Sequence, residues 1–137
     1  MNGPPQVDPP NPEIYSLMGE ENIFQMLEDF YDELAASEIK DMFPSDPDEL
    51  AEAAYKSGCF FVGLCGGPPL YHQKYGNPML RRRHFPFPIN MNGRNIWLEC
   101  FLKTLDKAEE KYDFPQEYLA GFINFLTEFS PWMINKA

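Results

Sequence analysis

The sequence has no long apolar run and little positive charge, and each shortage excludes a class of protein. No stretch approaches the about 18 consecutive apolar residues of a membrane helix, so we expect no membrane span. Lys and Arg together number 11 against 21 Asp and Glu, which gives a formal net charge of −10. A surface this acidic repels phosphate backbones and anionic headgroups, so we expect neither a nucleic-acid partner nor a membrane partner.

Cysteine is scarce, and the N-terminus lacks the features of a secretory signal. Cys59, Cys65 and Cys100 are an odd set without C-x-x-C spacing, so a zinc site is not predicted. Their apolar neighbours favour buried, reduced thiols. The first residues contain neither a basic region nor an apolar core, so we expect a cytoplasmic protein.

Aromatic residues are abundant, with 12 Phe, 7 Tyr and 2 Trp in 137 residues. The length fits one globular domain. The aromatic side chains would form either a large core or the walls of a pocket for a flat ligand, and composition leaves both open.

The proline pattern separates an extension from a helical domain. Residues 1–13 contain five prolines, which predicts a flexible extension before a domain over 14–137. Within that domain, apolar residues recur at steps of three and four from residue 20 to 36, as on one face of a helix. Those residues are Ile23, Phe24, Leu27, Phe30, Tyr31 and Leu34.

A second helix is predicted by its end signals. Asp46 suits the N-cap, Pro47 the first helical position, and Glu49 completes a capping-box pattern. This helix should end near Leu64, because the Gly-Gly-Pro-Pro run over 66–69 follows.

The second half of the chain predicts a loop and three further helices. We expect a loop over 69–76, a short helix opened by Pro78 and closed by Pro86, a helix capped by Asn90, and a last helix from about Pro115. The helix capped by Asn90 would have an apolar face that consists of Ile96, Trp97, Cys100, Phe101, Leu105 and Ala108. Strict two-residue alternation is absent, which predicts an all-α protein with about four main helices.

The segment "LRRRHFPFPI" over 80–89 concentrates positive charge in an acidic chain. It fits either a solvated helix face with a structural histidine or a ligand site. In the second interpretation His84 would bind a metal, and Arg81 and Arg83 would pair with carboxylates. Phe85 and Phe87, locked by prolines, would exclude water. An apolar ligand with a metal centre and edge carboxylates is a haem.

Five segments together carry a more specific signature. They are "FYDEL" (30–34), "MFPSD" (42–46), "GGPPLY" (66–71), "GNPMLRRRHFPFPI" (76–89) and "IWLECF" (96–101). In this order and spacing they resemble the truncated haemoglobins, group II in particular, from about residue 14 to the end. The resemblance implies a two-over-two helical sandwich around one b-type haem.

The resemblance also implies roles for individual residues. His84 matches the proximal iron ligand, and Tyr31 matches a distal tyrosine. Trp97 matches the tryptophan whose indole N–H reaches the distal pocket, and Phe43 matches an aromatic residue on the haem face. Tyr31 and Trp97 also lie on the apolar faces described above, where either could be an ordinary core residue.

The haem edge and the distal helix complete the implied site. Arg83 and Tyr71 match positions that meet the propionates, with Arg81 assisting and Phe87 in the collar beside His84. His72 is expected to be an exposed loop residue.

About two extra residues, within "DPDE", follow the Phe43 region. Counted back from the glycine pair, Ala53 falls at the distal gate and Ser57 faces the iron. A slip of one residue would replace them with Ala54 and Gly58. The first register gives a small gate and a polar floor.

The two implied donors, Tyr31 and Trp97, suit the partial negative charge on iron-bound dioxygen. Each would contribute on the order of 1 kcal/mol or more. Two such donors would slow release of the bound ligand. We therefore expect a protein that binds dioxygen, NO or CO for scavenging or for reactive oxygen or nitrogen chemistry. It would act as a monomer or a homodimer. A peroxidase or an NO dioxygenase that uses an external reductase is the alternative, with the same two residues in catalysis. A third hypothesis is a helical adaptor or sensor that binds no haem.

A visible spectrum tests the haem interpretation. Protein from haem-replete cells should show a Soret band at one haem per chain, in both the oxidised and the reduced state. His84→Ala should abolish or strongly alter that band, because the variant lacks the implied iron ligand. A folded but colourless protein that refuses added hemin would instead favour the adaptor.

Overall fold

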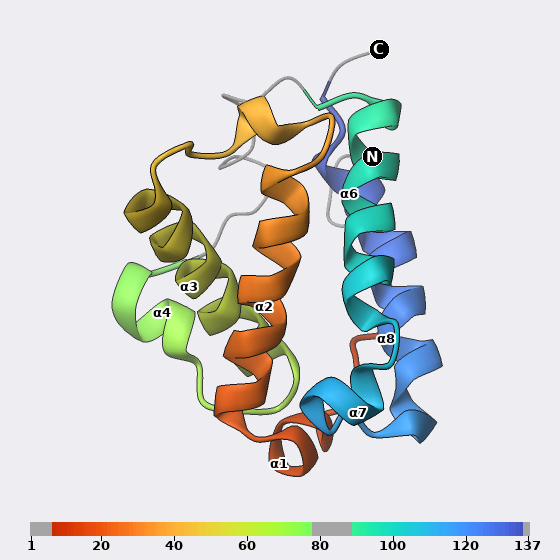
Figure 1. The fold of residues 1–137 in the computed structure, drawn as a ribbon. Coiled ribbons are helices and arrows are strands. Elements are labelled where there is room, and N and C mark those ends of the chain that lie inside the picture. Colours follow the sequence, from red (N-terminus) through yellow and green to blue (C-terminus); the bar gives the residue numbers. More distant parts are fainter. Residues whose placement is uncertain (1–6, 78–88, 136–137) are drawn as a thin grey trace.

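A computed structural model describes residues 7–77 and 89–135, and regular structure in these ranges is helical throughout. The elements are α1 (Ile14–Met18), α2 (Glu20–Ala35), η1 (Lys40–Met42), α3 (Pro47–Leu64), α4 (Leu70–Tyr75), α6 (Met91–Leu105), α7 (Ala108–Tyr112), α8 (Gln116–Phe129) and η2 (Ser130–Met133). Figure 1 shows α2 beside α3 as one pair and α6 beside α8 as another. The all-α prediction is confirmed.

Two of the main helices, α3 and α6, begin where their capping residues predict. The Asp46 carboxylate accepts a hydrogen bond from the Glu49 backbone N–H at 3.1 Å, and α3 begins at Pro47. The Asn90 side chain accepts from the Gly93 N–H at 2.8 Å at the start of α6. Each cap satisfies a backbone donor that has no partner inside the helix.

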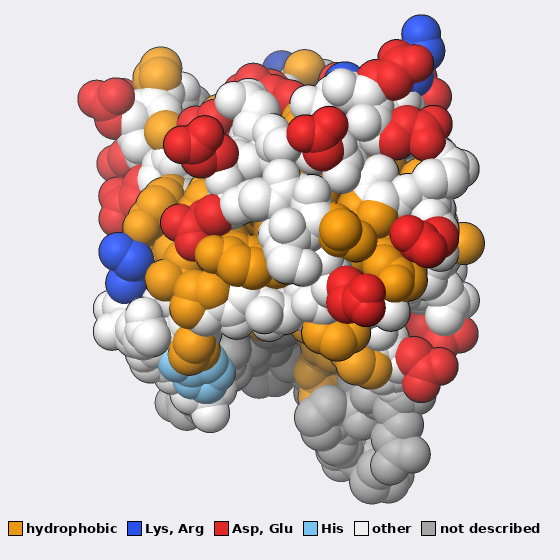
Figure 2. Space-filling model, turned by 90° about the horizontal axis from the view of Figure 1, so that it is seen from below, with side chains coloured by type: hydrophobic (Ala, Val, Ile, Leu, Met, Phe, Trp, Pro, Cys, Tyr) orange, Lys and Arg blue, Asp and Glu red, His pale blue; other side chains and the backbone are white. Residues whose placement is uncertain are grey.

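The core forms where the apolar faces of the helices meet. On α2 the buried residues recur at the predicted spacing, and α3, α6 and α8 contribute large side chains opposite them. The buried set includes Ile23, Met26, Leu27, Phe30, Leu34, Phe61, Val62, Phe101, Leu105, Phe122 and Leu126. Acidic side chains are spread over the surface, with hydrophobic side chains between them, as Figure 2 shows for one face. No helix in the described ranges is both long enough and apolar enough to cross a membrane.

Two predicted boundaries differ from the structure. The segment 69–76, expected as a loop, contains α4, which starts after Pro69 and carries Tyr71 on its buried side. Prolines ahead of a first turn do not oppose a helix, because the first helical N–H groups have no partner in any case. The apolar face predicted to run to Ala108 is divided, since α6 ends at Leu105 and Ala108 begins α7. The short helix expected from Pro78 lies outside the described residues.

The described part of the proline-rich extension, residues 7–13, lies against the helices. Pro10 is buried and Val7 packs on the core. The Tyr15 backbone N–H donates to the Cys65 carbonyl at 2.9 Å. A Cβ at Gly66 (φ 101°) would lie 1.9 Å from the Pro12 carbonyl oxygen. The N-terminal segment therefore holds the chain where α3 ends.

Gly66→Ala tests this contact. It should lower the free energy of unfolding by about 2–4 kcal/mol, because backbone strain and overpacking against backbone each cost roughly 1–3 kcal/mol. Gly121→Ala is the control, since it lies in α8 with nothing within 4 Å of the added Cβ. It should gain about 0.5–1 kcal/mol from better helix propensity. Urea denaturation measures both, and a neutral Gly66→Ala would refute the contact.

Candidate functional site

An aromatic cluster joins α2, α6 and the residue after η1. Phe30 stacks on Phe101 with ring centroids 4.1 Å apart and meets Tyr31 and Trp97 edge-on at 5.6 and 5.4 Å. Tyr31 in turn lies edge-on to Phe43 at 5.7 Å. The structure therefore brings together three of the residues that the sequence assigned to the distal pocket and the haem face. They come from three separate segments of the chain.

Tyr31 combines an apolar environment with one polar neighbour. Burial raises the pKa of its phenol above the ordinary value of 10.0, and a hydrogen-bonding interaction with Ser57 lowers it. A hydroxyl that donates a hydrogen bond to the phenol oxygen lowers the pKa of the phenol, because it stabilises the phenolate. Burial is the larger effect, so the Tyr31 phenol stays protonated at neutral pH. It remains available as a donor.

Helix α3 supplies the polar neighbour from a well-defined face. Ser57 and Ala53 are half-buried and one turn apart. The alternatives for a slipped register, Ala54 and Gly58, are both buried. A Cβ at Gly58 would lie 2.4 Å from Cδ1 of Phe24, so this side of α3 packs against α2. Ser57 rather than Gly58 interacts with Tyr31.

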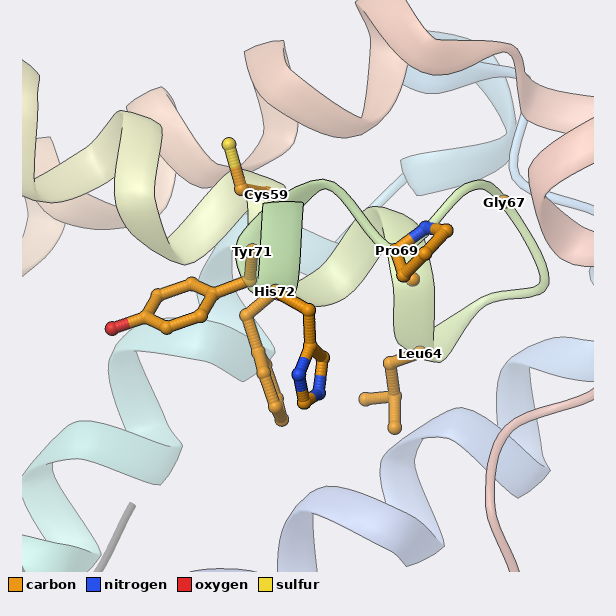
Figure 3. A pocket seen from close by; sticks show the side chains of 8 residues that line it. Cys59, Leu64, Gly67, Pro69, Tyr71 and His72 are labelled. Carbon is orange, nitrogen blue, oxygen red and sulfur yellow. The ribbon is translucent and has the colours of Figure 1, made fainter. Parts of the chain in front are cut away.

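A cavity of about 250 Å³ opens between α3 and α4. Its lining consists of Cys59, Phe60, Gly63, Leu64, Gly67, Pro69, Tyr71 and His72 (Figure 3). Tyr71 is 6% exposed and meets Phe60 edge-on at 6.4 Å. His72 is exposed, as expected, but it lies on α4 rather than in a loop. In Figure 3 its imidazole and the Leu64 side chain extend to the same side of the cavity, away from Tyr71.

Phe60 and Leu64, which line the cavity between α3 and α4, were not predicted from the sequence, although their helical spacing was a signal for them. Together with Ala53 and Ser57 they recur at steps of four, three and four along α3. Residues with that spacing share one face of a helix. Once Ser57 was assigned to a site, periodicity would have predicted that Phe60 and Leu64 lie on the same face of α3, although the cavity that these two line includes only Tyr71 among the assigned residues.

The remaining assigned residues are not described by the structure. Arg81, Arg83, His84 and Phe87 all lie within 78–88, outside the described ranges. In the part of the chain that is described, no three His, Cys, Asp or Glu residues gather as a metal site. Aromatic walls with a phenol and an indole N–H fit a flat, mostly apolar cofactor such as haem.

Ser57→Ala should shift the ionisation of Tyr31. The variant loses the interaction that lowers the pKa of Tyr31 and keeps the burial that raises it, so the pKa should rise further. NMR of ¹³Cζ-labelled tyrosine over an alkaline titration measures this, with Tyr31→Phe to assign the signal. Ser45→Ala, at an exposed position, is the control. An unchanged titration in Ser57→Ala would show that Ser57 does not contact the phenol.

Comparison with known proteins gives the family. Residues 13–130 match the family described as bacterial-like globin. The group 2 truncated hemoglobin YjbI of Bacillus subtilis is 42% identical over 93 residues, 67% of this chain and 68% of that protein. Two-on-two hemoglobin-3 of Arabidopsis thaliana is 47% identical over 49 residues, 36% of this chain and 28% of that protein.

Solved structures give the same answer for the fold. Hell's gate globin IV superposes with a TM-score of 0.89 at 34% identity, covering 96% of this chain and 80% of that one. The truncated oxygen-avid haemoglobin from Bacillus subtilis gives 0.79 at 35% identity, covering 91% and 99%. The resemblance and the truncated-globin fold drawn from the sequence are confirmed. The chain belongs to the bacterial-like globins, and its similarity to the group II truncated haemoglobins implies binding of a diatomic ligand at a haem.

Proposed function

We propose that this protein binds dioxygen, or another diatomic such as NO or CO, at a b-type haem whose iron is held by His84. The haem supplies the iron atom at which the ligand binds. Arg81, Arg83 and Tyr71 would hold the propionates at the edge of the cofactor. The apolar contacts to the ring would come from Phe43 and Phe87.

The observation that carries the proposal is the convergence of Tyr31 and Trp97 on Phe30. Tyr31 lies on α2 and Trp97 on α6, and both rings meet Phe30 within 5.6 Å. A phenol and an indole N–H on separate helices form a pair of donors for one small polar ligand. Because burial keeps the pKa of Tyr31 above 10.0, its proton is retained for donation.

Ser57 gives the phenol a defined direction. If the Ser57 hydroxyl donates to the Tyr31 oxygen, the phenolic hydrogen is left for the bound ligand. Ala53, one turn earlier on α3, would leave a small gate to solvent. The polar floor and the open gate fit a pocket that admits a diatomic ligand easily and holds it by hydrogen bonds.

The strength of these bonds indicates the physiological task. A hydrogen bond contributes about 1 kcal/mol, which corresponds to roughly fivefold in a rate or an equilibrium. Two donors would slow oxygen release, which suits scavenging or reactive oxygen or nitrogen chemistry better than delivery. One structural relative from Bacillus subtilis is described as oxygen-avid, which supports the same interpretation for this chain.

Turnover as a peroxidase or an NO dioxygenase is the second candidate. As hydrogen-bond donors, Tyr31 and Trp97 would also stabilise negative charge that develops on an oxygen ligand during reaction, so both would serve in catalysis. Such a reaction needs electrons, which we assign to an external reductase.

A reducing, cytoplasmic location fits the three thiols. Cys59, Cys65 and Cys100 are free and buried. Burial raises the pKa of Cys65 to about 12, so its thiol is kept in the protonated, poorly reactive form. Either a monomer or a homodimer would be compatible with the site, since the proposed ligands come from one chain.

Tyr31→Phe separates the two candidates. It should speed oxygen release by roughly fivefold or more through loss of one hydrogen bond, as measured by stopped-flow displacement of dioxygen with CO. If the protein is mainly a catalyst, the same change should instead abolish peroxide turnover. Tyr118→Phe is the control, since its hydroxyl bonds Glu13 at the surface. If Tyr31→Phe alters neither rate, the distal-pocket assignment is wrong.

A further inference from the structure

Tyr112 on α7 is a buried phenol bonded to a carboxylate. It is 2% exposed, and its hydroxyl donates to Oδ2 of Asp29 at 2.5 Å. The other Asp29 oxygen, Oδ1, accepts from Nε2 of Gln25 at 3.0 Å. Asp29 lies on α2 and α7 packs against that helix. The carboxylate is therefore held in place from two sides.

This pair differs from the other tyrosine–carboxylate pairs in the described ranges. Tyr15 bonds Glu20 at 3.0 Å and Tyr118 bonds Glu13 at 3.2 Å, and both bonds are exposed. The Tyr112 bond, which is partly buried, is shorter, as a charge-assisted bond from a buried phenol should be. Burial, and then Asp29, raise the pKa of Tyr112, so the phenol is protonated at neutral pH. Removal of an electron from this ring must therefore displace a proton, and Asp29 is in position to take it.

The pair adjoins the aromatic cluster. Asp29 immediately precedes Phe30 and stands two residues before Tyr31, so the Cα atoms of Asp29 and Tyr31 are at most about 7.6 Å apart. The hydrogen bond thus attaches Tyr112 to the turn of α2 that carries the proposed distal donor, with the Asp29 and Tyr31 side chains on different sides of that helix. Figure 1 shows α7 at one end of α2, between α1 and α8.

A run of aromatic rings also leads from Phe114, near Tyr112 in the sequence, to Trp97 in the aromatic cluster. Phe114, two residues after Tyr112, meets Phe122 at 5.2 Å. Phe122 meets Phe101 at 5.8 Å, and Phe101 meets Trp97 at 5.6 Å. All the rings between Phe114 and Trp97 belong to one packed core.

We propose that Tyr112 is a redox-active tyrosine that supplies an electron when peroxide is reduced at the haem, with Asp29 as the acceptor of its phenolic proton. This rests on the proposed haem function. One hydrogen peroxide would take one electron and one proton from Tyr112, one electron from haem that the external reductase has reduced, and one proton from solvent, and would yield one tyrosyl radical and two waters. The peroxide O–O bond breaks, the Tyr112 phenol loses one electron and one proton, and the partly exposed Asp29 carboxyl passes that proton to solvent.

The consequence is protection of the distal residues. Tyr31 and Trp97 are themselves oxidisable and would lie nearest the peroxide. Tyr31 has a serine hydroxyl beside it, which is a poor proton acceptor, whereas Tyr112 has a carboxylate. An oxidising equivalent should therefore come to rest on Tyr112.

Freeze-quench electron paramagnetic resonance on the haem-loaded, chemically reduced full chain, mixed with one equivalent of hydrogen peroxide, tests the proposal. The wild type should give a tyrosyl radical signal that is lost in Tyr112→Phe and kept in the control Tyr15→Phe, since the hydrogen bond of Tyr15 to Glu20 is exposed. In Asp29→Asn the signal should appear more slowly, by roughly tenfold or more, because general-base assistance contributes at least that factor. Circular dichroism establishes that each variant is folded. Peptide mass spectrometry should find more oxidation at Tyr31 or Trp97 in Tyr112→Phe.

Each contrary outcome has a distinct meaning. A wild-type signal in Tyr112→Phe overturns the assignment of the radical. A peroxide-induced change in the Soret band without any protein radical overturns the redox role and leaves the proposed function standing. A chain that takes up no haem overturns the proposed function, and with it the source of the oxidation.

Discussion

Packing around Phe30 is the interaction on which the site depends. The ring is 1% exposed, stacks on Phe101 and receives the edges of Tyr31 and Trp97. Each aromatic pair contributes about 0.5–1.5 kcal/mol beyond the area that it buries, so this contact fixes the spacing of α2 and α6. The proposed donors extend from these same helices. Their geometry therefore follows from the core of the protein and not from surface loops.

Helix α3 is held relative to that core at its C-terminal end and along one side. The Asp46 cap defines where the helix starts, and contact of Pro12 with Gly66 restrains the chain where it ends. Between them Gly58 lets Phe24 approach the α3 backbone closely. A Cβ at position 58 would overlap the Phe24 ring, so that ring or the contact between α3 and α2 would have to shift. The close approach of α3 and α2 at this point therefore depends on a glycine.

Local signals predicted the helices well and their mutual arrangement poorly. Periodicity and caps located α2, α3, α6 and α8 because those signals lie within each helix. The α4 helix was missed because prolines and glycines around it are typical of loops, although Tyr71 gains burial there. The grouping of Tyr31 with Trp97 came from a family resemblance, since no local pattern relates residues on different helices. For the same reason, nothing in the sequence indicates that Asp29 and Tyr112, 83 positions apart, share a hydrogen bond.

The partly buried Tyr31 and the buried Tyr112 illustrate how the partner decides the chemistry of a side chain. Burial raises the pKa of both Tyr31 and Tyr112, so both are neutral donors at neutral pH. Beside Tyr31 stands a serine hydroxyl, which does not accept a proton from a phenol and leaves it free to bond a ligand. Beside Tyr112 stands a carboxylate, which does accept one when the ring loses an electron. A haem pocket that holds oxygen also encounters peroxide, and under the proposed function these two environments assign ligand binding to one tyrosine and oxidation to the other.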